Sequence, residues 1–490
     1  MRASLTRAAA AVALLAVAAC AASPDRTTEL ARIDQRAGYR YVTIDANGPK
    51  SVDKAAVLMS FSGGGTRAAA LADGALRALA ETEVGSANNQ VPLASQIDVI
   101  SSVSGGSVTS AYFALYGIDG LGNLEQNFLK RDIVGALAGR TFFNPGAWFQ
   151  PRIDILSSYL DQNVFQGKTY QDLIAAEAPG RSRRPYVILN AADMATGGVF
   201  SFTQDQFDLI CGDLAKLKVA DAVSASAAFP VALSALTLRN HAPCAAQTAA
   251  AANPVSGWTT SDGAPAPVRI VNDRAADAAA GVAYPKAENV ARFRRGTVAL
   301  TYLNRDGDKK YVQLLDGGIA DNLGLTQPFR LLTSPNESPS FLNQLNTGRV
   351  NKVLLVVVNA RGESDKKFGE SPTPPGVTDM LLTSIGTPID GTSFQFLGQL
   401  DQLLDDRFKP KSIVLVDFDL IADRACRSYF HNMATSWTLP PRQVDDLIAL
   451  GKAMVLQSPR YQAMVAALGG RVPPARPTVE EICARARLGS

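Results

Sequence analysis

A short run of serine and glycine after an apolar segment carries the strongest chemical signal in the sequence. The apolar segment ends at Ile100, the run Ser-Ser-Val-Ser-Gly-Gly-Ser occupies residues 101–107, and residues 108–116 have the pattern of a helix. A strand that turns sharply into a helix exposes the turning residue above a helix N-terminus, and glycines permit the tight backbone. Ser104 therefore has the position of a nucleophilic serine in a G-x-S-x-G elbow, with Ser102 in place of the first glycine. A Ser/Gly connection without catalysis produces the same pattern, so this stretch alone leaves both interpretations open.

A second glycine-rich turn precedes this serine in the chain. Residues 55–61 have the composition of a buried strand, three glycines follow at 63–65, and an Ala/Leu-rich helix is predicted over 68–81. Consecutive N–H groups at a helix N-terminus favour negative charge. A phosphate-binding loop is the weaker interpretation, because neither the Gly-Lys-Ser/Thr ending of a Walker A loop nor a G-x-G-x-x-G spacing is present. We expect an oxyanion hole, in which amides stabilise the charge that develops on a carbonyl oxygen.

A carboxylate stands at the end of a later predicted strand. Residues 297–302 and 310–315 are expected to form a hairpin around residues 304–308, whose Asp-Gly pair favours a tight turn. Asp316-Gly317-Gly318 follows the second strand, where open α/β sheets place their ligands. An Asp that only forms the turn is an equal alternative for this position taken alone. Residues 353–358 form a continuous apolar run, which is typical of a central parallel strand.

The first residues of the chain predict its compartment. Arg2 and Arg7 precede an apolar run over 8–19 that is too short to span a bilayer, and Cys20 follows. Residues 17–20, Val-Ala-Ala-Cys, resemble a bacterial lipobox, in which the cysteine is lipidated and becomes the first mature residue. An ordinary secretory signal with an incidental cysteine is the alternative. We expect a protein of the bacterial cell envelope, lipid-anchored to a membrane facing the periplasm, the outer membrane included.

The composition agrees with a globular enzyme. Of 490 residues, 47% are hydrophobic and 19% are charged, and the formal net charge is +3. This is enough apolar material for a large core, and it lacks the basic excess of a nucleic-acid-binding protein, so we expect no nucleic acid partner. His241 and His431 are the only histidines and no C-x-x-C pair occurs, so neither a metal site nor a cofactor is predicted.

Four cysteines follow Cys20, and an even number in an oxidising compartment predicts two disulfides with three possible connectivities. The shorter loops favour the pairs Cys211–Cys244 and Cys426–Cys483.

The expected organisation is one catalytic domain with extensions. Residues 1–19 are assigned to a lipoprotein signal peptide, 20–50 to a polar tether that becomes more ordered toward the domain, and 51–460 to the domain itself. Within that domain, the Ala-, Pro- and Gly-rich residues 241–295 are expected to be a surface insertion with little regular structure. Residues 461–490 are expected to form a C-terminal tail of helix and Pro/Arg-rich chain.

Three motifs in this order resemble the patatin-like phospholipases and their relative, the catalytic domain of cytosolic phospholipase A2. The motifs are Ser62-Gly63-Gly64-Gly65-Thr66-Arg67, Ser102-Val103-Ser104-Gly105-Gly106 and Asp316-Gly317-Gly318. Residues 224–230 and 316–322 are similar to two further stretches of that family, and the resemblance covers about residues 53–360. The sequence departs from the family pattern at Ser102, for the elbow's first glycine, and at Ser62, where patatins often carry Asp.

The resemblance implies an α/β fold, a three-layer α/β/α sandwich around a mainly parallel central sheet, with a Ser–Asp dyad. Ser104 would attack the acyl carbonyl and Asp316 would take its proton directly. Arg67 would steady the loop or bind the lipid phosphate. The oxyanion would be held by three amides, those of Gly64, Gly65 and Gly105. The implied reaction is cleavage of the carboxylic ester bonds of membrane phospholipids or lysophospholipids.

Two other classes of protein remain open at this point. Ser104, Asp316 and His431 follow the Ser-Asp-His chain order of an α/β-hydrolase esterase. Against it, the three glycines directly follow a strand, and residues 427–431 have no strand-end context. The other class is a non-catalytic lipoprotein scaffold, which has no chemical need for an intact serine, aspartate and glycine loop. The scarcity of histidine favours the dyad.

Overall fold

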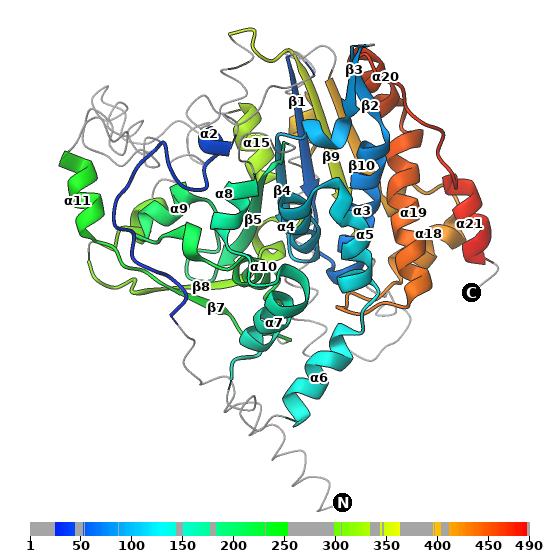
Figure 1. The fold of residues 1–490 in the computed structure, drawn as a ribbon. Coiled ribbons are helices and arrows are strands. Elements are labelled where there is room, and N and C mark those ends of the chain that lie inside the picture. The colour runs from blue at the N-terminus through cyan, green and yellow to red at the C-terminus, as the bar shows by residue number, and fades with distance from the viewer. Residues whose placement is uncertain are drawn as a thin grey trace, which may run out of the picture.

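A mixed eight-stranded sheet forms the centre of the molecule, as the computed structural model shows (Figure 1). Its strand order is β10-β9-β1-β4-β5-β8-β7, and β6 pairs with β5. The strands are β1 (Ala55–Phe61), β4 (Val99–Val103), β5 (Tyr186–Asp193), β6 (Val199–Ser201), β7 (Leu236–Arg239), β8 (Tyr311–Asp316), β9 (Lys352–Asn359) and β10 (Lys411–Asp417). A separate hairpin is formed by β2 (Glu83–Ser86) and β3 (Asn89–Pro92). The structure describes residues 25–44, 52, 54–86, 88–143, 150–176, 183–230, 232–252, 298–304, 306–333, 344, 347–362, 395, 397–402 and 411–487.

The helices flank this sheet. The α-helices whose bounds lie within the described residues are, in chain order, α2 (Tyr41–Ile44), α3 (Gly65–Glu81), α4 (Gly105–Tyr116), α5 (Leu121–Leu124), α6 (Ile133–Phe143), α7 (Arg152–Leu160), α8 (Tyr170–Ala176), α9 (Gln204–Leu209), α10 (Val219–Ser226), α11 (Ala245–Ala252), α14 (Gly318–Asp321), α15 (Thr326–Thr333), α18 (Arg424–His431), α19 (Pro441–Gln457), α20 (Pro459–Ala467) and α21 (Val479–Arg487).

Five adjacent strands, β10, β9, β1, β4 and β5, run parallel to one another. Every residue of β1, β4 and β5 is buried. Strands covered on both faces read as continuous apolar runs, which is why β1 and β9 were recognisable in the sequence. The predicted strand over 55–61 is confirmed at both ends.

Two successive side chains of β1, which point to opposite faces of the sheet, show that helices cover both faces. Phe61 lies directly against Gly106 of α4. The hydroxyl of Ser60 donates to the carbonyl of Leu323, between α14 and α15. Because successive side chains of a strand point to opposite faces, α4 and the α14–α15 segment lie on different sides of the sheet. The expected α/β/α sandwich is therefore confirmed.

The predicted hairpin of residues 297–302 with 310–315 is wrong. Residues 298–302 are helical, and β8 instead pairs with β7 on one side and with β5 on the other, antiparallel to both. The Asp-Gly turn exists, since the amide of Gly307 donates to the carbonyl of Asn304 at 3.0 Å, but it joins a helix to a strand. Tyr302 is buried and its hydroxyl donates to Asp193, so tertiary contacts override its preference for strand.

The described part of the predicted tether is packed against the domain. Tyr39 is only 1% exposed, and its hydroxyl exchanges hydrogen bonds with the backbone of Val187. The buried side chain of Arg40 forms ion pairs with Asp208, which is also buried, and with Asp205, whose side chain is partly exposed. Residues 25–44 therefore belong to the folded body, whereas residues 1–24, with the predicted signal peptide and Cys20, lie outside the described part.

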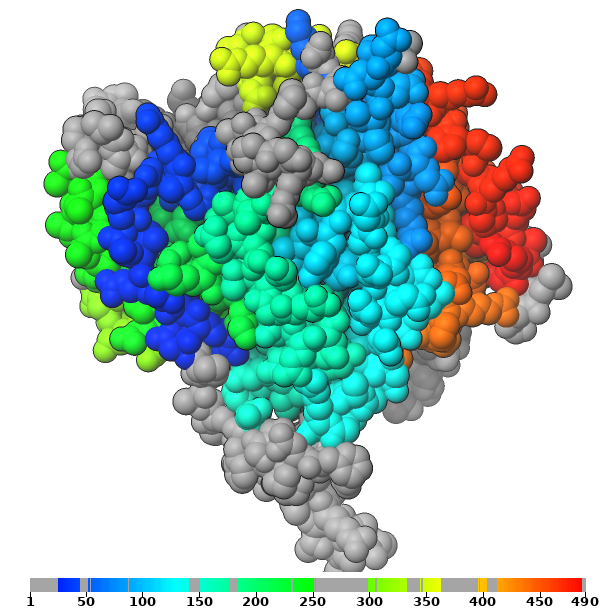
Figure 2. All heavy atoms as spheres, in the orientation of Figure 1, coloured from blue at the N-terminus to red at the C-terminus, as the bar shows by residue number. Residues whose placement is uncertain are grey.

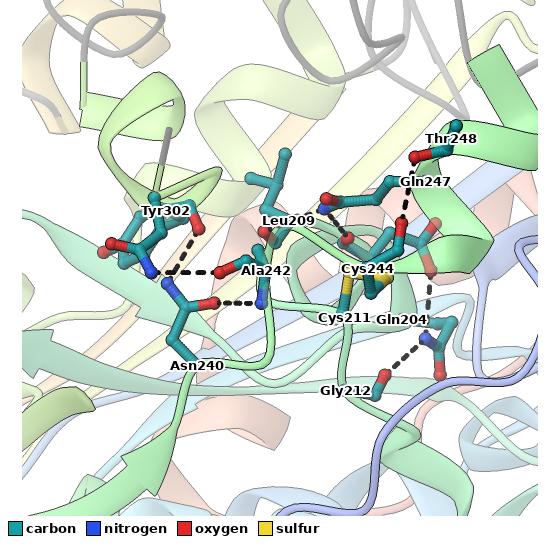
Figure 3. Close-up of a disulfide and its surroundings, with 12 residues drawn as sticks. Gln204, Leu209, Cys211, Gly212, Asn240, Ala242, Cys244, Gln247, Thr248 and Tyr302 are labelled. Carbon is teal, nitrogen blue, oxygen red and sulfur yellow. Dashed lines mark hydrogen bonds between the residues drawn. A yellow bond between two sulfur atoms is a disulfide. The ribbon is translucent and has the colours of Figure 1, made fainter. Parts of the chain in front are cut away.

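Both disulfides join the pairs that the loop lengths favour. Cys211–Cys244 connects the chain after α9 to the residue that precedes α11, and Cys426–Cys483 connects α18 to α21. Figure 3 shows the first of these beside Gln247, whose side chain donates to the carbonyl of Leu209 at 3.1 Å. The start of the predicted insertion is thus a helix tied to the body, and residues 253–295 of it lie outside the described part.

Candidate active site

Ser104 lies in the turn between β4 and α4, and its backbone has a conformation that residues other than glycine rarely adopt. Its φ is 52° and its ψ is −123°. A non-glycine residue in this region carries strain that the surrounding structure must hold in place. The amide of Ser104 donates to the hydroxyl of Ser226 at 2.9 Å, and its carbonyl accepts from the amide of Ser107 at 2.9 Å. These contacts hold the serine at the tip of a sharp strand-to-helix turn, as the elbow pattern predicts.

The hydroxyl of Ser104 donates to Oδ2 of Asp316 over 2.8 Å. The other carboxylate oxygen, Oδ1, accepts from the amide of Gly318 at 2.8 Å. Burial raises the pKa of Asp316 to about 6, and the hydrogen bonds from Ser104 and Gly318 oppose that rise. A base works best when its pKa lies near the working pH, so this carboxylate is better matched to proton transfer than an exposed one.

Asp316 reaches Ser104 from an unexpected direction. Strand β8 runs antiparallel to β5 and ends opposite Ala191, two residues before β5 itself ends at Asp193. The aspartate thus lies near the carboxyl end of the parallel strands, as expected, but on a strand that runs the other way. Its amide donates to the carbonyl of Ala228 at 3.0 Å, and the next amide, of Gly317, donates to that of Ser226 at 2.9 Å.

The glycine loop between β1 and α3 lies directly beside the elbow. Gly64 and Gly65 have φ values of 141° and 60°, which favour glycine. A Cβ on Gly105 would stand 2.0 Å from the carbonyl oxygen of Gly65, so the two loops can approach only as glycines. The loop is also fixed from outside, since the amide of Gly63 donates to the carbonyl of Asn322 at 3.1 Å.

Three amides at this junction have no hydrogen-bond acceptor among the described residues. Gly65 and Gly105 are the first residues of their helices, where an N–H has no acceptor inside the helix. Among the hydrogen bonds of the described residues, none uses the amide of Gly64, Gly65 or Gly105. Two adjacent helix N-termini with unused amides next to the Ser104 hydroxyl form a favourable environment for an oxyanion.

Arg67 lies within the protein, beneath the glycine loop. The residue is 3% exposed, and Nε donates to the carbonyl of Ala360 at 2.8 Å. One terminal nitrogen donates to the carbonyl of Met433, and the other to the hydroxyl of Thr435 at 3.0 Å. Burial lowers the pKa of Arg67 to about 10. Of the two roles expected for Arg67, this geometry favours support of the loop over binding of a lipid phosphate.

A buried cluster of hydroxyls beneath Ser104 was not predicted from the sequence. Ser226 accepts from the Ser104 amide, donates to the carbonyl of Asn190 at 2.6 Å and contacts the hydroxyl of Ser107 at 2.9 Å. The hydroxyl of Ser107 also donates to the hydroxyl of Ser102 at 3.2 Å. Ser102, which replaces the elbow's first glycine, therefore takes part in this network. The motif at 224–230 pointed to the segment, but nothing local identified Ser226 as the side chain that holds the nucleophile.

Both histidines have partners elsewhere in the structure. Nε2 of His431 lies 3.0 Å from a carboxylate oxygen of Asp419, and Nε2 of His241 lies 3.1 Å from the carbonyl of Thr27. In the described part of the chain, neither imidazole makes a hydrogen bond to Ser104 or Asp316. The Ser-His-Asp alternative requires a histidine between the serine and the carboxylate. In this structure the hydroxyl of Ser104 instead donates directly to the carboxylate of Asp316.

The described residues present neither a cluster of metal ligands nor a helix that could cross a bilayer. They contain no group of three or more His, Cys, Asp or Glu side chains placed to bind a metal ion. They also contain no helix of the length and apolar character that a bilayer span requires.

This chain is similar to a solved structure and to a family of known proteins. A solved structure of human GIVD cytosolic phospholipase A2 is similar with a TM-score of 0.40 at 12% sequence identity, and the match covers 87% of this chain but only 64% of that one. No curated protein sequence matches. The family model for the patatin-like phospholipases matches residues 59–329, which include the glycine loop, the serine elbow and Asp316. This match covers more than half of the 490 residues and confirms the family predicted from the motifs. The chain belongs to the patatin-like phospholipase family of lipid hydrolases.

Proposed function

We propose that the protein is a serine acyl hydrolase that cleaves carboxylic ester bonds of phospholipids or lysophospholipids through a dyad of Ser104 and Asp316. The observation that carries this proposal is the 2.8 Å hydrogen bond from the Ser104 hydroxyl to a buried carboxylate oxygen of Asp316. A serine hydroxyl is a weak nucleophile until a base takes its proton, and Asp316 is the base that touches it.

In the first half of the proposed reaction, Oγ of Ser104 attacks the acyl carbonyl as its proton passes to Asp316. Negative charge then develops on the carbonyl oxygen, and the unused amides of Gly64, Gly65 and Gly105 stabilise it. The intermediate collapses when the carbon–oxygen bond to the leaving alcohol breaks. Asp316 returns the proton to that alcohol, which leaves the acyl group on the serine.

In the second half, water replaces the alcohol. Asp316 takes a proton from the water as its oxygen attacks the acyl-serine, and the same amides hold the new oxyanion. When the bond to Ser104 Oγ breaks, the proton returns to the serine and the free fatty acid leaves. The carboxylate must be ionised at the start of each half, so a pKa near 6 suits neutral conditions.

We also propose that the mature chain is lipid-anchored through Cys20 in the bacterial cell envelope. The motif Val-Ala-Ala-Cys at 17–20, after an apolar run that is too short to span a bilayer, supports this. Such an anchor would hold the hydrolase at its lipid substrate.

Incubation with mixed bacterial phospholipids, followed by mass spectrometry of the products, tests the proposed activity. The expected products are free fatty acids with the matching lysophospholipids or glycerophosphodiesters. A fluorophosphonate probe should label the wild-type protein at Ser104 and fail to label Ser104→Ala. A folded protein that releases no fatty acid and takes no label would contradict the proposal and favour a non-catalytic scaffold.

A further inference from the structure

The first described residues of the chain are bound to α7 and α10 by ion pairs. The side chain of Arg26 is 6% exposed and forms ion pairs with Asp154 of α7 and with Asp221 of α10. The hydroxyl of Thr27 donates to the carbonyl of Arg239 at 2.9 Å. The N-terminal segment therefore enters the folded body at the end of the molecule that carries α7 (Figure 1).

The covalent chain limits how far Cys20 can lie from this point. Cys20 precedes Asp25 by five positions (25 − 20). Fully extended, such a segment spans at most about 3.6 Å per residue, or roughly 18 Å. A lipid on Cys20 would therefore hold the end of the molecule beside Asp25 close to the bilayer surface.

Helix α6 lies at this same end and has an unusual composition for a surface helix. It packs against α7 and projects beyond it, at the bottom of Figure 1. Its sequence, Ile-Val-Gly-Ala-Leu-Ala-Gly-Arg-Thr-Phe-Phe, contains a single charged residue, Arg140. Val134 is nevertheless 48% exposed, and Figure 2 shows the helix (cyan) at the molecular surface. A helix with so few polar residues is normally covered by core or by lipid.

The dyad is connected to this end by a short stretch of chain. The carbonyl of Ala228 accepts the amide of Asp316, and four residues later the carbonyl of Ala232 accepts from Arg152 at the start of α7. Between them, Phe229 is 39% exposed, a large apolar side chain at the surface next to the site. Lipid at the α6–α7 end would thus lie near the reacting groups.

We propose that the α6–α7 end, with Val134 at its surface, is the face that contacts the lipid bilayer, and that the lipid on Cys20 holds it there. This inference rests on the proposed lipid anchor and names the surface through which the hydrolase meets its substrate. A second copy of the chain on α6 is the competing occupant.

Two matched variants test this face by activity. Val134→Asp places a charge on α6, and Val42→Asp places the same charge on α2 at the opposite end of the molecule, where Val42 is 45% exposed (Figure 1). With lipidated protein on vesicles of phosphatidylethanolamine and phosphatidylglycerol, Val134→Asp should lower phospholipid hydrolysis about tenfold or more, because an exposed apolar side chain that would enter the lipid is replaced by a charge. Hydrolysis of a soluble short-chain nitrophenyl ester should stay unchanged, which shows that the variant folds. Val42→Asp should change neither.

Equal vesicle activity of the two variants would overturn the proposal. So would a wild-type dimer that Val134→Asp converts to a monomer, since a second copy would then cover α6. A wild-type protein that hydrolyses neither substrate would instead refute the proposed activity, and a readout without catalysis separates the two cases. Val134→Cys and Val42→Cys each introduce one free thiol for a fluorescent label. Lipid-borne quenchers should quench the label at 134 and not that at 42, and the reverse or equal quenching would refute the membrane face.

Discussion

Replacement of Asp316 by asparagine should abolish hydrolysis and at the same time stabilise the protein at neutral pH. Burial raises the pKa of this carboxyl from 3.8 to about 6. Between these values the native state binds more protons at this group than the unfolded state does, so the free energy of unfolding falls as pH rises through that window. Above about pH 6 the buried, ionised carboxylate lowers the free energy of unfolding by about 3 kcal/mol, which corresponds to a rise of about two units in its pKa. The amide side chain of Asp316→Asn carries no charge and avoids that cost, yet it has no basic lone pair for the serine proton.

Urea unfolding of the wild type, Asp316→Asn and Ser104→Ala at pH 8 and pH 4 measures this effect. We expect Asp316→Asn to gain up to about 3 kcal/mol over the wild type at pH 8 and less than about 1 kcal/mol at pH 4. Ser104→Ala keeps the buried carboxylate and should lose activity without this gain. An Asp316→Asn protein that is less stable than the wild type at pH 8, or a difference independent of pH, would refute the account of Asp316 as a buried, ionised base.

Three further outcomes follow from the site. The double variant His241→Ala/His431→Ala should hydrolyse a nitrophenyl ester at a rate within about tenfold of the wild type. Removal of a triad histidine lowers turnover on the order of 10⁴-fold, so a decrease of that size in a folded double variant would establish a triad. Gly64→Ala should lower turnover by about 10²-fold or more in a protein that still folds, because a side chain at φ 141° displaces an oxyanion amide. Full activity would remove this assignment. Cys20→Ser should move the protein from the membrane fraction to the soluble one or leave its signal uncleaved, and unchanged fractionation of a processed chain would contradict the lipid anchor.

The parallel part of the fold was predictable because its signals are local. A strand buried on both faces needs only apolar side chains, and β1 and β9 contain such runs. The turn after β4 needs small residues and a helix N-terminus, which the run around Ser104 supplies. The sequence pattern predicts these strands and this turn correctly because their conformation depends on residues only a few positions away.

The antiparallel part was not predictable in this way. The residues 298–302 carry β-branched and aromatic side chains, but the contacts of Tyr302 with Asp193 and Asn240 hold them in a helix. Likewise, nothing in residues 25–44 indicated that Tyr39 and Arg40 would find partners on β5 and α9. The partners in each case lie far along the chain, and periodicity carries no information about them.

By itself, the sequence determined the types of group that could react: a serine at a tight turn, a carboxylate at a strand end and glycines at a helix N-terminus. Only the tertiary structure decided that they meet. Ser104 and Asp316 are separated by 212 positions, and the strand that delivers Asp316 runs antiparallel to its neighbour β5. The strain at Ser104 is likewise held by Ser226, 122 positions away. Such contacts depend on which segments pack together once the core closes, because the free energy that orders them comes from burial shared by the whole sheet rather than from any one stretch of chain.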